Sequence, residues 1–184
     1  MEFTQKYRSR IVIKVLNKFL SKGKSVLDIG CGNGVVSYEI KKYFNCSLYG
    51  TDIQNYLKRD ISFKKIGRGY MLNFDDKEFD VGLIIDVLHH LPFDMQIKLV
   101  KEALRVCSEV LIIEDKPTLI GKIIDILINK IHNAKMPITL TFRTKEEWAR
   151  LFSENKISFG YHSVKTAFYY PFTHYLFHLK TKNR

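Results

Sequence analysis

The chain is poor in cysteine and proline, and it has no long apolar run. Its three cysteines, at positions 31, 46 and 107 of 184 residues, show no metal-ligand spacing and indicate reduced thiols. No apolar stretch approaches the roughly 18–20 residues of a membrane span. The first ten residues are polar and lack the apolar core of a secretion signal. These absences predict a cytoplasmic protein with no transmembrane segment, no disulfide framework and no metal site.

Acidic residues are also scarce, since 19 of them face 30 Lys and Arg, a net charge of +11. Residues 116–184 hold 12 basic and 4 acidic side chains, so a net of +8 lies in the last third. A basic face attracts nucleic acid, an anionic lipid surface or a small anionic substrate. A merely solubilising surface explains the same charge, and the sequence leaves these alternatives open.

The length and composition fit one globular domain over residues 1–184. Hydrophobic residues make up 46% and charged residues 27% of the chain, close to the average of globular proteins. No internal repeat or low-complexity linker divides it. We therefore expect a single core and no domain boundary.

Apolar periodicity alternates along the chain between the strand and helix patterns. Because strands alternate with helices, we expect an α/β fold with a mostly parallel sheet, closed by an antiparallel C-terminal edge pair. Ligands of such sheets bind beyond the carboxyl ends of the strands. The expected helices are 10–20, 35–44, 94–106, 119–131 and 144–155, and the expected strands are 25–29, 47–51, 63–66, 79–85, 110–113, 157–164 and 173–179.

The sharpest motif is a glycine-rich turn between the first strand and the following helix. It reads Val26-Leu27-Asp28-Ile29-Gly30-Cys31-Gly32-Asn33-Gly34. Glycines permit a tight turn and let a ligand approach bare backbone at a helix N-terminus. Asp52 ends the next strand, where an acid accepts hydrogen bonds from a ribose diol. The pair indicates an adenosine ligand.

Asp28 distinguishes between adenosine ligands. A dinucleotide site uses G-x-G-x-x-G and places a pyrophosphate at the helix N-terminus, which a nearby carboxylate would repel. An acid two residues before Gly30 suits a ligand with an ammonium and a sulfonium instead. Here the chain resembles the class I S-adenosylmethionine-dependent methyltransferases of the type 11/12 kind. The segment Phe74–Asp80 and the sequence Asp86-Val87-Leu88-His89-His90-Leu91 are similar to that family's segments around its fourth strand.

The resemblance implies a Rossmann-like three-layer sandwich with seven strands, and S-adenosylmethionine as cofactor. It implies that Asp52 holds the ribose hydroxyls and that Ile53 packs on the adenine. The remaining cofactor-binding residues that it implies are Asp28, Gly30, Cys31, Gly32, Gly34, Tyr70, Met71, Leu72 and Asp86. Two departures stand out: Arg68 lies where the family often has an acid, and the segment between Asp52 and Phe63 is too short for a full crossover helix.

Three residues are candidates for catalysis at the mouth of this site. His89 and His90 follow the fourth strand, and either could serve as a general base, since an imidazole has a pKa near neutrality. Asp115 leaves the fifth strand and faces the same mouth, where it could bind a hydroxyl or amine acceptor. A structural role for each is the alternative. Cys31 is expected to be a small buried thiol and not a nucleophile.

The acceptor is the least determined part of the prediction. Residues 116–142 fit an acceptor lid with an Ile-rich basic helix, although ordinary packing on the sheet explains its apolar stripe equally. We expect a small-molecule or lipid-like acceptor. The alternatives are an RNA methyltransferase that uses the basic last third, and a non-catalytic cofactor-binding subunit of a partner enzyme. The sequence leaves the oligomeric state open.

Overall fold

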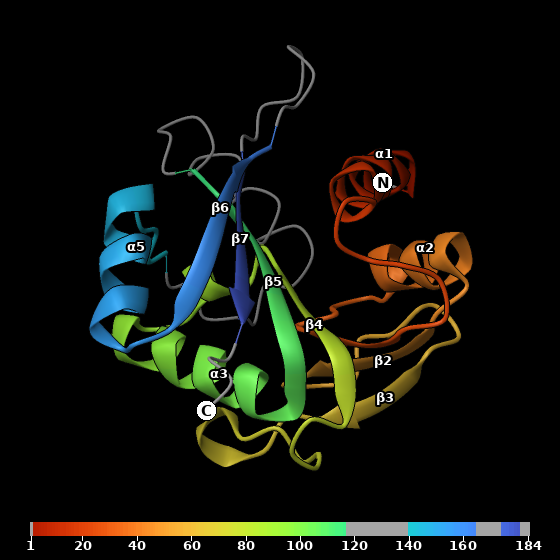
Figure 1. The fold of residues 1–184 in the computed structure, drawn as a ribbon. Coiled ribbons are helices and arrows are strands. Elements are labelled where there is room, and N and C mark those ends of the chain that lie inside the picture. The colour runs from red at the N-terminus through yellow and green to blue at the C-terminus, as the bar shows by residue number, and fades with distance from the viewer. Residues whose placement is uncertain (1, 117–139, 165–173, 181–184) are drawn as a thin grey trace.

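Seven strands form a single twisted sheet with helices on both faces, as the computed structural model of the chain shows (Figure 1). The structure describes residues 2–116, 140–164 and 174–180. The strand order is β3-β2-β1-β4-β5-β7-β6. The pairs among β1 to β5 are parallel, whereas β7 runs antiparallel to both β5 and β6. The predicted Rossmann-like three-layer fold with an antiparallel C-terminal pair is confirmed.

Most element boundaries lie within two residues of those expected from the sequence. The strands are β1 (Ser25–Ile29), β2 (Ser47–Asp52), β3 (Ser62–Lys65), β4 (Phe79–Ile85), β5 (Cys107–Asp115), β6 (Ser158–Ser163) and β7 (His174–Lys180). The helices are α1 (Glu2–Leu16), α2 (Val35–Phe44), α3 (Phe93–Val106) and α5 (Lys145–Glu154), with short 3-10 turns η1 (Arg68–Tyr70) and η2 (Leu88–His90).

Two elements have bounds other than those expected. The first helix covers Glu2–Leu16 instead of residues 10–20, because its polar first half is tied down by contacts that apolar periodicity does not reveal. Arg8, for example, donates to the carboxylate of Asp86, 78 residues away in sequence. The fifth strand extends beyond residues 110–113 at both ends because it pairs with β7 from Glu109 to Asp115.

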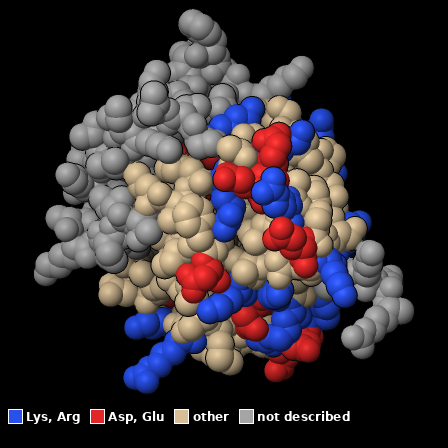
Figure 2. All heavy atoms as spheres, turned by 90° about the vertical axis from the view of Figure 1, so that its left-hand side faces the viewer, with Lys and Arg blue, Asp and Glu red and all other residues tan. Residues whose placement is uncertain are grey.

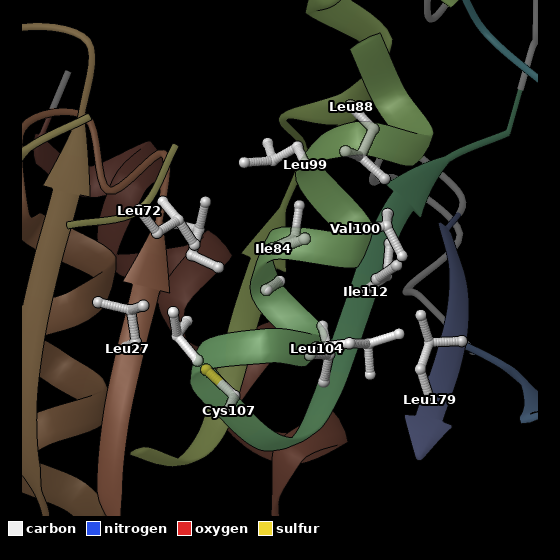
Figure 3. Packing of buried hydrophobic residues seen from close by; sticks show 14 of the residues in the cluster. Leu27, Leu72, Ile84, Leu88, Leu99, Val100, Leu104, Cys107, Ile112 and Leu179 are labelled. Carbon is white, nitrogen blue, oxygen red and sulfur yellow. The ribbon is translucent and has the colours of Figure 1, made fainter. Parts of the chain in front are cut away.

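Alternating side chains of the sheet build a hydrophobic cluster on each face. One face carries α1 and α2, where Leu16 and Ile40 pack against Val26 and Leu83. The other face carries α3 and α5. Figure 3 shows side chains of α3 lying between those of the flanking strands, and the labelled members of this cluster are Leu27, Leu72, Ile84, Leu88, Leu99, Val100, Leu104, Cys107, Ile112 and Leu179. The two clusters hold the sheet rigid beneath its carboxyl edge.

Local sequence also fixes the last described helix. Thr144 is the N-cap of α5, as expected, and its hydroxyl accepts a hydrogen bond from the Glu147 amide while the Glu147 carboxylate accepts from the Thr144 amide. This capping box satisfies two amides that would otherwise lack partners. Within the described parts of the chain, no helix is long and apolar enough to cross a membrane. The expected helix 119–131 and most of the expected lid 116–142 lie outside the described residues.

Candidate functional site

The glycine-rich turn joins β1 to α2 at the carboxyl edge of the sheet. Gly30, Gly32 and Gly34 all have positive φ angles, of 81°, 53° and 73°. A Cβ atom at Gly30 would lie 2.4 Å from a methyl carbon of Val87, so the close approach of the two loops requires glycine there. At Gly32 a Cβ atom would meet nothing within 4 Å, so this backbone faces open space. The turn therefore presents bare backbone on one side only.

Asp52 ends β2 beside this turn, as the sequence predicts. Its carboxylate accepts hydrogen bonds from the backbone N–H groups of Gly32, at 2.9 Å, and of Ile53, at 2.7 Å. Burial raises the pKa of Asp52 above its usual range, although those N–H groups act in the opposite direction. The glycine turn and the acid, 20 residues apart in sequence, are thus joined directly in the structure.

The residues expected around the adenine differ in their surroundings. Ile53 and Met71 are the most open of them, with 40% and 58% of their surface exposed. Tyr70 is partly buried, and the Ile66 amide donates to the Asp52 carbonyl, which places this loop next to Asp52. Leu72 is different, because its side chain belongs to the core and its backbone N–H and C=O are bonded to side chains of α3. No helix forms between β2 and β3, so the crossover is short as expected.

Asp28 lies in β1 directly beneath the turn. Its side chain is buried, and its carboxylate accepts a hydrogen bond from the Ser37 hydroxyl at 2.6 Å. Burial raises its pKa to about 6, and the nearby charge of Asp52 adds to this effect. A buried carboxylate that is costly to ionise indicates a place for a cation.

Asp86 follows β4 with a positive φ angle of 55° and takes part in a network of charges. Arg8 of α1 donates to its Oδ2 at 2.6 Å, and His174 Nε2 lies 3.4 Å from its Oδ1. The same His174 nitrogen lies 3.0 Å from Oδ1 of Asp115, the last residue of β5. Burial raises the pKa of Asp86, but the charges of Arg8 and His174 outweigh it and hold that pKa below its usual range.

The two adjacent histidines have separate environments. His89 is buried, its Nδ1 lies 2.6 Å from Oε2 of Glu114, and its ring stacks on Phe142. Oε1 of Glu114 accepts from the amides of Val87 and Leu88, so one buried carboxylate holds the whole turn after β4. Burial, together with the charge of His89, lowers the pKa of His90 to about 3. The pKa near neutrality that we expected from the sequence is therefore wrong for His90.

Cys31 lies within the turn but points into the protein. Its side chain is buried, and its sulfur would be 2.8 Å from a Cβ atom placed on Gly50. Burial raises the pKa of the thiol, which opposes formation of a reactive thiolate. The prediction of a small packed thiol is consistent with these surroundings.

Sequence reasoning missed two residues of the charge network, Arg8 and His174. Arg8 lies in the part of α1 that has no apolar period. His174 occupies a buried position at the start of a strand whose other buried residues are Leu176, Phe177 and Leu179. The sequence did offer one signal for His174: it is a polar residue at a position where the alternation of the strand predicts a buried side chain.

Part of the chain is similar in sequence to known proteins. Residues 27–110 match the family model described as a methyltransferase domain. The chain is 31% identical over 98 residues to a tRNA U34 carboxymethyltransferase of Nautilia profundicola. The aligned region covers 47% of this chain and 32% of that protein. The chain spans less than two thirds of the length of the curated relatives that it matches.

Solved structures share the fold over nearly the whole chain. A SAM-dependent methyltransferase from Archaeoglobus fulgidus has a TM-score of 0.70 at 16% identity, over 97% of this chain and 98% of that one. The magnesium protoporphyrin IX methyltransferase of Synechocystis, solved with SAH bound, has a TM-score of 0.63 at 18% identity, over 98% and 84% of the two chains. Residues 27–110 are thus similar to a methyltransferase domain, and the chain as a whole shares the fold of solved methyltransferases.

Proposed function

We propose that this chain binds S-adenosylmethionine along the carboxyl edge of β1 and β2 and transfers its methyl group to a small-molecule or lipid-like acceptor. The observation that supports this most strongly is the contact between the glycine turn and Asp52. The Gly32 backbone faces open space on one side, and its N–H holds the Asp52 carboxylate in place. A ribose diol fits at such a carboxylate because its two hydroxyls both need acceptors.

The surroundings of Asp52 fit the rest of the cofactor. Ile53 and Met71 offer exposed apolar side chains on which an adenine ring can pack. Asp28 lies within β1 and Asp86 directly follows β4, and both favour a cationic group nearby. The same acids would repel a pyrophosphate, which argues against a dinucleotide.

The protein does not have to activate the methyl group, because bound S-adenosylmethionine supplies it already activated on a sulfonium. The residues of the chain bind the cofactor and the acceptor, orient them and exclude water. These are the main sources of rate enhancement for such a displacement. His89 and Glu114 act as positioning residues in this proposal, since their buried pair fixes the turn after β4. The low pKa of His90 disfavours it as a general base at neutral pH.

RNA is the second candidate acceptor. The basic last third of the sequence and the similarity to a tRNA-modifying enzyme favour it. The face in Figure 2 mixes the two signs, with Lys and Arg most crowded at its lower edge and Asp and Glu among them. Over the described residues of that face, acidic side chains interrupt the basic ones. The small-molecule or lipid-like acceptor remains our first choice.

A labelling experiment tests this proposal. The purified chain and S-adenosylmethionine with a labelled methyl group are added to an extract of the source organism, which is then separated into RNA, protein and organic-soluble pools. We expect label in the small-molecule or organic pool. Label that nuclease releases from the RNA pool would overturn our choice of acceptor. Cofactor binding with no label in any pool would instead support a non-catalytic subunit that acts through a partner.

A further inference from the structure

The ends of three neighbouring strands bring two carboxylates and one imidazole together. Asp86 follows β4, Asp115 ends β5, and His174 begins β7 directly opposite Asp115 in the register. One donor atom from each residue lies within 4.8 Å of the other two. Asp115 and His174 are buried, and the Asp86 side chain is 14% exposed, although its Oδ1 atom is itself buried.

A single shared proton provides too few hydrogen bonds for the polar atoms of this group. The Nε2 atom of His174 carries at most one hydrogen, yet it faces Oδ1 of Asp115 at 3.0 Å and Oδ1 of Asp86 at 3.4 Å. Neither of these buried carboxylate oxygens receives a hydrogen bond from any residue that the structure describes. One hydrogen shared between two oxygens bonds weakly to at least one of them, whereas a metal ion accepts all three atoms.

The two separations from His174 Nε2, 3.0 Å and 3.4 Å, match those expected among the ligands of one metal ion. Ligands at about 2.0–2.2 Å from a metal lie roughly 3.0–3.5 Å from each other in tetrahedral or octahedral geometry. The outer oxygen of Asp86 is held by Arg8, which leaves its inner oxygen directed at the group. Such outer hydrogen bonds orient the ligands in protein metal sites.

We propose that Asp86, Asp115 and His174 form a binding site for a divalent transition-metal ion. Two carboxylates with one imidazole suit Zn²⁺ or Mn²⁺. Three protein ligands leave coordination positions open, and we place an oxygen of the methyl acceptor in one of them. That second step, unlike the metal binding itself, rests on the proposed function. The acceptor class it implies has a hydroxyl or carboxylate oxygen next to the methylated atom.

Calorimetry on the full chain tests the metal site without any activity assay. The protein is treated with a chelator, freed of it, and titrated with Mn²⁺ and with Zn²⁺. We expect one ion per chain. His174→Ala and Asp115→Asn should each weaken binding at least about tenfold, the smallest loss typical of a damaged metal site. His178→Ala is the matched control, because His178 lies on the same strand and pairs with Glu109 instead.

Every outcome bears on the proposal. Circular dichroism confirms that each variant is folded, and the nearly isosteric Asp115→Asn serves if His174→Ala unfolds. The absence of one-to-one binding, or equal affinity in His174→Ala and His178→Ala, would overturn the metal site and leave a proton shared within an ion-pair network. Metal binding without methyl transfer would retain the site and refute only the proposed function.

Discussion

Replacing Asp28 by asparagine should stabilise the cofactor-free protein at neutral pH. Asp28 is buried and has a pKa of about 6, against 3.8 for the ordinary side chain. Each unit of pKa difference corresponds to about 1.4 kcal/mol, so ionised Asp28 costs the folded state about 3 kcal/mol. Asparagine removes this cost, and its amide oxygen can still accept the hydrogen bond from the Ser37 hydroxyl.

The pH dependence of this gain follows from the direction of the pKa shift. Because the pKa is raised by folding, the folded state holds the proton more tightly, and stability is lost as the pH rises from about 4 to above 6. Above pH 7, Asp28→Asn should therefore show its largest gain in the free energy of unfolding. Any N–H group of the new amide that lacks a hydrogen-bond partner would reduce this gain. By pH 4.5 the gain should shrink by about 2 kcal/mol, because neutral Asp28 resembles asparagine.

Urea denaturation at pH 4.5 and 7.5 measures the free energies of unfolding. Asp80→Asn is a control of opposite sign, since hydrogen bonds from Ser25 lower the pKa of Asp80 and its loss should cost stability at neutral pH. A difference between wild type and Asp28→Asn that does not change with pH would refute the assignment of a buried, costly charge. We also expect Asp28→Asn to bind S-adenosylmethionine more weakly, a loss of function in exchange for stability.

Four further substitutions test the turn, the last helix and the core. Gly32→Ala and Gly23→Ala both place alanine in open space at positive φ, so we expect similar losses of about 1–2 kcal/mol in stability but weaker cofactor binding in Gly32→Ala alone. Equal affinities in calorimetry would contradict a ligand at this turn. Thr144→Ala removes the capping box and should cost about 1 kcal/mol in urea denaturation, and a neutral result would show that the cap contributes nothing. Phe152→Ala should cost about 3–5 kcal/mol because Phe152 is fully buried against Trp148, and a loss below 1 kcal/mol would mean that this face of the core repacks freely.

The sequence was sufficient for the sheet and for the glycine turn because their signals are local. The strand Phe79–Ile85, for example, is apolar from Val81 onward, as expected for a strand buried on both faces, and it is bounded by Glu78 and Asp86. The glycines and Asp52 stand at the ends of adjacent strands, so the topology alone brings them together.

The charge network could not be predicted in the same way. Arg8, Asp86, Asp115 and His174 come from four elements, and only the register of β5 against β7 and the placement of α1 bring them into contact. The pKa of His90 was wrongly expected for a similar reason. It depends on burial and on the neighbouring His89, neither of which a residue type reveals.

Binding of S-adenosylmethionine to the purified chain tests the central claim most directly. Isothermal titration calorimetry should show one molecule per chain, and Asp52→Ala should weaken binding by about 1–3 kcal/mol, as expected when a charged hydrogen-bond partner is lost. Glu154→Ala, which removes an exposed acid of α5, should leave the affinity unchanged. No binding to the wild type, or the same affinity in Asp52→Ala and Glu154→Ala, would contradict a cofactor site at the end of β2.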